Sequence, residues 1–127
     1  MGDRALIIFK KGADISPIVY LHWAGCHVTD YIVELASLAG GQAMAADYAA
    51  ARFIGIAHQA NPGTLSLGVQ QTPPELVEAI CKSNAKVIAE YSHGDAGLVI
   101  VDASDFSWIA YDGYLAESVD RDMEKAT

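Results

Sequence analysis

The sequence predicts an α+β fold: a two-layer sandwich in which an antiparallel sheet of four to five strands carries two main helices on one face. Three observations lead to this prediction. Strand-like segments cluster near the two ends of the chain, within 4–23 and 98–111. Two stretches with helical periodicity lie between them, over 29–39 and 43–60. The regular strand-helix-strand alternation of a parallel sheet is not seen in the pattern.

The first two strands are predicted over 4–10 and 16–23, joined by a turn at 11–14, so that they form a hairpin. Pro17 stands at the start of the second strand, where a missing amide donor is tolerated. Side chains of a strand alternate between its two faces. Tyr20 and His22 are therefore expected on one face, and Trp23 on the opposite face.

The first helix is expected to start at Thr29 or Asp30, both good N-cap residues, and to end at Gly40. The second runs from Ala43 to Ala60 with an alanine-rich stripe, and alanine has the highest helix propensity. Asn-Pro-Gly at 61–63 stops it.

The remaining elements are shorter. Residues 64–70 alternate cleanly and predict a half-buried strand with Leu65, Leu67 and Val69 on one face. A short helix is expected over 73–81, whereas 86–91 fits a helix or a strand equally. Strands are expected over 98–101 and 106–111, and a short terminal helix over 114–127.

Composition limits the class of protein. A chain of 127 residues with 52% hydrophobic content predicts a single domain, 1–127, around one core. No apolar run approaches the roughly 18 to 20 residues of a membrane-spanning helix, and no secretory signal is visible, so a cytoplasmic protein without membrane contact is expected. Cys26 and Cys81 are expected to be reduced thiols.

Charge is distributed unevenly. The net charge is −8, and residues 1–86 carry seven acids against six bases, whereas 87–127 carry nine acids against two bases. A field of this sign repels phosphate backbones, so direct binding of nucleic acid is not expected. It attracts basic protein surfaces instead. The residues predicted to bind such a partner are Asp95, Asp102, Asp105, Asp112 and Glu117.

The segment 20–27, Tyr-Leu-His-Trp-Ala-Gly-Cys-His, places several reactive side chains between a strand and a helix. His22, Cys26 and His27 would need a fourth ligand such as His93, Asp95 or Cys81 to hold zinc, and the familiar paired spacings are missing. We therefore predict no metal and no cofactor. Cys26 next to His27 or His22 is a weak candidate nucleophile, and a small buried filler is the more ordinary role.

Arg52 is the one Lys or Arg between Lys11 and Lys82, and it lies on a mostly apolar helix. Such an arginine is expected to pair with a carboxylate of Asp47, Asp95 or Asp102, or to bind an anionic ligand. The second reading gives a candidate ligand site made of Tyr20, His22, Tyr48 and Arg52. Trp23, Tyr20 and Trp108 are candidates for an aromatic wall or for the core.

Five short motifs occur in order along the chain: Arg4-Ala5-x-Ile7-x-Phe9, Val19-Tyr20-Leu21-His22-Trp23-x-Gly25, Tyr48-x-x-Ala51-Arg52-Phe53, Leu65-Ser66-Leu67-Gly68-Val69 and Gly94-Asp95-x-Gly97. With these motifs the chain resembles a family of small uncharacterised proteins of phages, prophages and bacterial mobile regions. The resemblance extends from about position 4 to 111, and it implies a shared fold and a phage-related context without a known activity. The stretch between Gln70 and His93 and the acidic end depart from the family pattern.

Two functions remain open from the sequence. The first is a non-enzymatic interaction protein, such as a phage-encoded counter-defence (anti-CRISPR-like) inhibitor, whose acidic C-terminal third occupies a basic nucleic-acid-binding surface of a host nucleoprotein complex. The alternative is a small-molecule or nucleotide-binding protein, or a weak enzyme, with a pocket around His22, Tyr48 and Arg52. Unpaired edge strands can also pair between two copies of a chain, so a homodimer is a further alternative.

Overall fold

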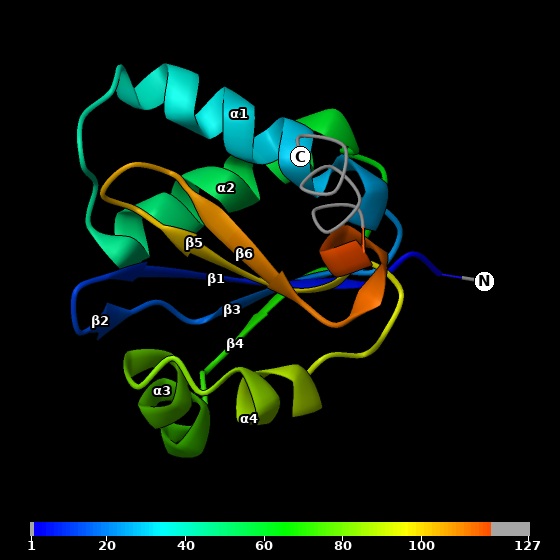
Figure 1. Ribbon diagram of the computed structural model, residues 1–127. Coiled ribbons are helices and arrows are strands. Elements are labelled where there is room, and N and C mark those ends of the chain that lie inside the picture. The colour runs from blue at the N-terminus through cyan, green and yellow to red at the C-terminus, as the bar shows by residue number, and fades with distance from the viewer. Residues whose placement is uncertain (1, 118–127) are drawn as a thin grey trace, which may run out of the picture.

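The computed structural model describes residues 2–117. Strands and helices alternate irregularly along this part of the chain (Figure 1). In chain order the elements are β1 (Ala5–Lys11), β2 (Asp14–Ile15), β3 (Ile18–Leu21), the 3-10 turn η1 (Gly25–His27), α1 (Val28–Ala39), α2 (Ala46–Ala60), β4 (Leu67–Gln70), α3 (Pro74–Cys81), α4 (Ala85–Glu90), β5 (Gly97–Asp102) and β6 (Trp108–Tyr111).

One mixed sheet forms the middle of the molecule, with strand order β4-β3-β1-β5-β6 and the short β2 paired to β1. β1 and β3 form the expected antiparallel hairpin, with Ala5 opposite Leu21. β5 then returns beside β1 in the parallel direction, with Ala5 opposite Gly97 and Lys10 opposite Asp102. β1 is therefore the central strand, and β4 and β6 are the two edges.

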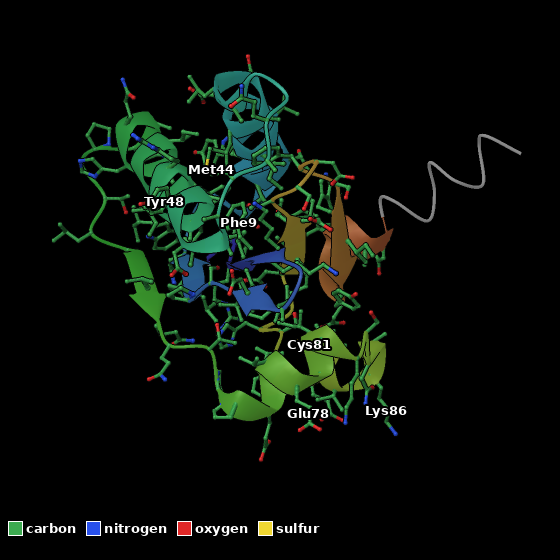
Figure 2. All side chains as sticks on the ribbon, turned by 90° about the vertical axis from the view of Figure 1, so that its left-hand side faces the viewer. Phe9, Met44, Tyr48, Glu78, Cys81 and Lys86 are labelled. Atoms are coloured by element: carbon green, nitrogen blue, oxygen red, sulfur yellow. The ribbon has the colours of Figure 1, made fainter. Side chains whose placement is uncertain are left out.

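α1 and α2 cover one face of the sheet. The core on this side is built by alternate sheet residues, including Ile7, Phe9 and Val99, against Leu35 of α1 and Phe53 of α2. The Phe9 and Phe53 rings lie 5.6 Å apart at a tilt of 60°, and both are fully buried. Figure 2 shows Phe9 beneath α2. Burial of this apolar face fixes the two helices on the sheet.

α3 and α4 cover the other face. The sheet residues that alternate with those of the first face, Leu6, Ile8 and Ile100, pack there against Leu76 of α3 and Ile88 of α4. Pro74 opens α3 at the first helical position, and the Asn84 side chain caps α4 by accepting a hydrogen bond from the Val87 amide. Glu78, Cys81 and Lys86 lie on this side of the sheet, across from Tyr48 (Figure 2).

The α+β class is confirmed, and so is the position of two main helices on one face. The prediction of an all-antiparallel, two-layer arrangement is wrong, because β1 and β5 are parallel and because helices cover both faces. The physical reason is visible in β1: Ala5, Leu6, Ile7, Ile8 and Phe9 are buried without alternation. A strand that is apolar on both sides needs a cover on both sides.

Three smaller expectations concern shorter segments. Residues 86–91 are mostly helix, since α4 spans Ala85–Glu90. The strand expected over 64–70 forms only at Leu67–Gln70, and its expected buried face is largely open, since Leu65 is 98% exposed and Val69 is 60% exposed. Residues 113–117 are helical, and the rest of the terminal helix expected over 114–127 lies outside the described residues.

Candidate functional site

A cavity of about 270 Å³ lies at the junction of the β3 end, η1 and the C-terminal end of α2. Its volume is just below the range of typical small-molecule pockets. It is lined by Leu21, His22, Trp23, Ala24, His27, Ala57, Asn61, Thr64, Ser66 and Leu67. Five residues of the segment 20–27 therefore line a cavity, which is a precondition for a binding site at the strand-helix junction.

Asp3 holds this segment in place. Its amide donates to the carbonyl of His22 at 2.7 Å, and its own carbonyl accepts from the Gly25 amide at 2.9 Å. Its carboxylate accepts from the Cys26 amide at 2.8 Å and from the Tyr114 hydroxyl at 2.6 Å. Gly25 is required by this close approach, because a Cβ there would lie 2.7 Å from the Asp3 carbonyl oxygen. One aspartate therefore joins the N-terminus, the cavity wall and residue 114.

His22 is fixed between two aromatic rings. Its Nδ1 is 2.6 Å from the Tyr20 hydroxyl, and its ring contacts Trp23 edge-on with the centroids 4.3 Å apart. A Cβ on Gly2 would lie 2.9 Å from Nε2, so the N-terminal backbone packs against that side of the ring. The contact of Nδ1 with the Tyr20 hydroxyl and the ring contact with Trp23 fix the orientation of His22, so His22 positions Trp23 at the cavity.

The expectation that His22 and Trp23 lie on opposite faces is wrong. β3 ends at Leu21, so period-two alternation no longer applies at these two positions, and a bend brings both to the cavity. Trp23 remains 54% exposed. Part of its indole is therefore accessible to a ligand, and it is not a core residue.

Polar groups of the α2–β4 connection form the other side of the cavity. The Asn61 side chain donates to the Tyr31 hydroxyl at 3.2 Å, and the Asn61 carbonyl accepts from the Thr64 amide at 3.1 Å. Thr64 Oγ1 accepts from the Ser66 amide at 3.3 Å, and Ser66 in turn accepts from the His22 amide. The connection is thereby ordered by its own hydrogen bonds and by β3.

These polar lining residues were missed by sequence reasoning. Asn61 was interpreted only as part of a helix stop, and Thr64 and Ser66 only as the polar positions of a strand. The available signal was the run of hydrogen-bonding side chains Asn-x-x-Thr-x-Ser directly after a helix, since such loops often carry binding residues.

The predicted ligand set of Tyr20, His22, Tyr48 and Arg52 is not assembled. Tyr20 contacts His22 but does not line the cavity. Tyr48 lies nine residues before Ala57 on α2, about 14 Å along the axis, and lines a separate depression with Asp14, Ile15 and Asp47. Tyr48 and Arg52 are both exposed.

Arg52 also lacks the expected carboxylate. No ion pair links it to Asp47, Asp95 or Asp102 within residues 2–117. It lies five residues before Ala57, about 140° around the helix, and points to solvent. Arg52 does not need a carboxylate partner, because only the alanine-rich stripe of α2 faces the sheet and Arg52 lies on the exposed side of the helix.

The predicted partner-binding acids are divided between the two ends of the sheet. Asp95 pairs with Arg4, whose Nε lies 2.9 Å from the carboxylate. The hydrogen bonds from the Arg4 side chain and amide lower the pKa of Asp95. The carbonyl of Asp95 accepts from the Tyr114 amide at 2.8 Å, so Asp95, Asp112 and Glu117 lie near Asp3 at one end.

Asp102 and Asp105 lie at the other end: Asp102 is the last residue of β5, and Asp105 lies in the turn between β5 and β6 (Figure 1). The two ends are separated by the six residues of β5, roughly 20 Å at about 3.3 Å per residue. The Asp102 carboxylate accepts from the Ser104 amide at 2.9 Å. The Asp105 carboxylate accepts from the Ser107 hydroxyl, two residues later, at 2.6 Å. The Ser107 hydrogen bonds lower the pKa of Asp105. Both acids are therefore turn-forming residues.

The two cysteines are free and exposed, so the interpretation of Cys26 as a buried filler is wrong. Partial burial and the Asp3 carboxylate raise the pKa of Cys26, which opposes formation of a nucleophilic thiolate. Over 2–117, no three His, Cys, Asp or Glu side chains come together in a way that could hold a metal ion. Trp108 lies on β6, at the opposite edge of the sheet from β4, so it does not join Trp23 in one wall.

No family model matches this chain, and no curated protein or solved structure shows significant similarity to it. The resemblance to phage and mobile-element proteins therefore stays a prediction. None of the helices in the described part of the chain has the length and apolar character needed to cross a membrane.

Proposed function

We propose that the chain binds a small, uncharged, planar ligand in the cavity at the β3–α1 junction. The observation that carries the proposal is the lining: Trp23, Leu21 and Leu67 supply apolar surface, and His27, Asn61, Thr64 and Ser66 supply hydrogen-bonding groups. An apolar pocket with a few convergent polar groups is the usual form of a small-molecule site. The Trp23 indole offers a face or edge for stacking.

Charge narrows the ligand class. No Asp, Glu, Lys or Arg lines the cavity. Two carboxylates lie close behind its wall: that of Asp30 is 3.8 Å from His27 Nδ1, and that of Asp3 accepts from the Cys26 amide. A phosphate would enter a site without a cation, in a chain of net charge −8. A free nucleobase or an indole-like heterocycle therefore fits the cavity better than a nucleotide. Of the small-molecule and nucleotide ligands considered from the sequence, we propose the uncharged small molecules.

The test is a thermal-shift and calorimetric comparison of adenine and indole with AMP. Binding of an uncharged heterocycle to the native state raises the melting temperature, whereas AMP is expected to bind at least tenfold more weakly. Trp23→Leu should weaken binding at least tenfold. Tyr48→Ala is the matched control, because Tyr48 is also an exposed aromatic residue but lies outside the cavity. The proposal fails if neither heterocycle binds, or if Trp23→Leu binds like the wild type.

A second function is favoured by the charge distribution: binding of a basic protein surface, as a counter-defence inhibitor would do. Asp95, Asp112 and Glu117 lie with Asp3 at one end of the sheet, where Arg4 is the neighbouring base. We propose this end, rather than all five predicted acids together, as the surface for such a partner. Asp102 and Asp105 would belong to a different contact.

Two double variants, each with two acids replaced by lysine, distinguish the two ends of the sheet. Binding of a nona-arginine peptide should weaken in Asp112→Lys with Glu117→Lys, and should be nearly unchanged in Asp102→Lys with Asp105→Lys. Wild-type binding should also fall steeply as salt rises. Equal loss in both double variants would contradict the assignment to one end.

A further inference from the structure

β4 is an edge strand whose outer side is unpaired within residues 2–117. Its inner side pairs with β3, with Leu67 opposite Leu21 and Val69 opposite Val19. The His22 amide donates to the Ser66 carbonyl at 3.3 Å, so residues 66, 68 and 70 form the hydrogen-bonded pairs with β3. In an antiparallel ladder the alternate residues point their backbone groups the other way. Leu67 and Val69 therefore present amide and carbonyl groups outward.

Apolar side chains accompany this open backbone edge. Val69 is 60% exposed, Leu65 is 98% exposed, and Trp23 at the neighbouring end of β3 is 54% exposed. Leu67 and Val69 face the α1–α2 side, because their partners Leu21 and Val19 belong to that core. An edge with exposed apolar side chains and free backbone groups is a template for a further strand.

The two edges of the sheet differ in charge. The 22 residues 53–74 contain no Asp, Glu, Lys or Arg, and β4 lies within this segment at the margin of the sheet (Figure 2). β6, the opposite edge, has Asp105 shortly before it and Asp112 directly after it. Pairing β6 with a second copy would bring these acids close to the same acids of the other chain. Their repulsion would oppose pairing, and charged residues commonly protect sheet edges in this way. β4 has no such protection.

Gly68 lies in the middle of this edge, and within the described residues a Cβ there would meet nothing within 4 Å. Antiparallel self-pairing that hydrogen-bonds Leu67 to Val69 of the second copy places the two Gly68 residues opposite each other, in a non-hydrogen-bonded pair of about 4.5 Å between Cα atoms. This spacing is ordinary for an antiparallel ladder, so Gly68 is compatible with the pairing.

We propose that β4 is a dimer interface, at which two copies of this chain pair antiparallel about a two-fold axis at Gly68. A second copy fits this edge because antiparallel pairing of β4 with itself is self-complementary: the outward backbone groups of Leu67 meet those of Val69 on the other copy. Each chain has a net charge of −8. Two such chains repel each other through their acid-bearing surfaces, and the charge-free β4 edge is where they can meet without like charges in contact. Basic partners are drawn to the acids elsewhere on the molecule. The dimer joins two sheets into one continuous sheet.

The first test measures mass against concentration by sedimentation equilibrium. The wild type should change from one chain to two with rising concentration, and Val69→Lys should weaken association at least tenfold. Ile109→Lys is the matched control: Ile109 lies on the β6 edge and is also 60% exposed, so its dimer should be unchanged. A wild type that stays monomeric at millimolar concentration, an unaffected Val69→Lys, or a dissociated Ile109→Lys would each overturn the proposal.

The second test uses amide hydrogen exchange at high protein concentration. The outward amides of Leu67 and Val69 should exchange slowly in the dimer and fast in Val69→Lys or on dilution. Leu65→Lys, at a position 98% exposed, gives the same comparison if Val69→Lys is not folded by circular dichroism. Fast exchange of Leu67 in a wild-type dimer would show that another surface is the interface. These results do not depend on whether the cavity binds a ligand.

Discussion

Replacing Gly25 by alanine should destabilise the fold strongly, through the N-terminal contact that shapes the cavity. The added Cβ would lie 2.7 Å from the Asp3 carbonyl oxygen and 2.8 Å from the Ala96 Cβ. Both distances are shorter than nonbonded carbon contacts allow. Neither neighbour is the end of a flexible side chain, so the strand entry at Asp3 must move.

The magnitude follows from the bonds that this movement breaks. Asp3 makes backbone hydrogen bonds with His22 and Gly25 at 2.7 and 2.9 Å and carboxylate bonds with Cys26 and Tyr114 at 2.8 and 2.6 Å. A typical hydrogen bond contributes about 1 kcal/mol net, and overpacking costs about 1 to 3 kcal/mol. Because part of this network is exposed and can relax, we expect a loss of about 2 to 4 kcal/mol in the free energy of unfolding.

Urea unfolding followed by circular dichroism measures the loss, with Gly55→Ala as the control. Gly55 is an exposed position inside α2, and its Cβ would meet nothing within 4 Å. Alanine there should stabilise the helix by about 0.5 to 1 kcal/mol. The reasoning is refuted if Gly25→Ala loses less than about 0.5 kcal/mol, or if both alanine variants lose equally.

Three further predictions concern the core, the surface and acid stability. Phe53→Ala removes a fully buried ring from between the sheet and α2, and should cost about 3 to 5 kcal/mol in urea unfolding. Glu78→Gln breaks the exposed pair with Lys82 and should leave the urea midpoint nearly unchanged, so a clear decrease in the midpoint would contradict its surface role. The pKa of Asp95 is lowered in the folded state by Arg4, so this pair stabilises the fold at pH above the ordinary aspartate pKa of about 3.9 and loses that effect as pH falls below it. The difference in urea midpoint between the wild type and Arg4→Met should therefore narrow from pH 5 to pH 2, whereas a gap independent of pH would assign the effect to packing.

The local elements could be predicted from the sequence because their signals are local. Helical periodicity and a stopping glycine predicted α1, whose C-cap is Gly40 at φ 62°. The hairpin of β1 and β3 followed from two strand-like segments joined by a short turn. The parallel pairing of β1 with β5 joins residues 92 apart, Ala5 and Gly97, and no local pattern encodes such a partner. The unbroken apolar run 5–9 was nevertheless a readable sign of a central strand.

The predicted ligand residues are not brought together, although the segment that contains two of them reaches a cavity. The segment 20–27 does reach a cavity, and Tyr20 and His22 are paired as alternation predicts. Trp23 was misplaced because the strand ends two residues earlier than expected. Tyr48 and Arg52 were grouped with His22 from their residue types alone. α2 places them elsewhere along its length, and Asp3, the residue that organises the segment, carries no sequence signal of that role.

The position of β5 has a consequence for synthesis of the chain. β1 is made first, and Ile7, Ile8 and Phe9 are fully buried in the finished protein. The strand that covers one side of β1 is Gly97–Asp102, so that side stays open until most of the chain has left the ribosome. An unpaired apolar strand is prone to association with other chains. The nascent chain should therefore be most vulnerable before β5 emerges, and truncation ahead of residue 97 should yield an aggregating fragment rather than a smaller folded domain.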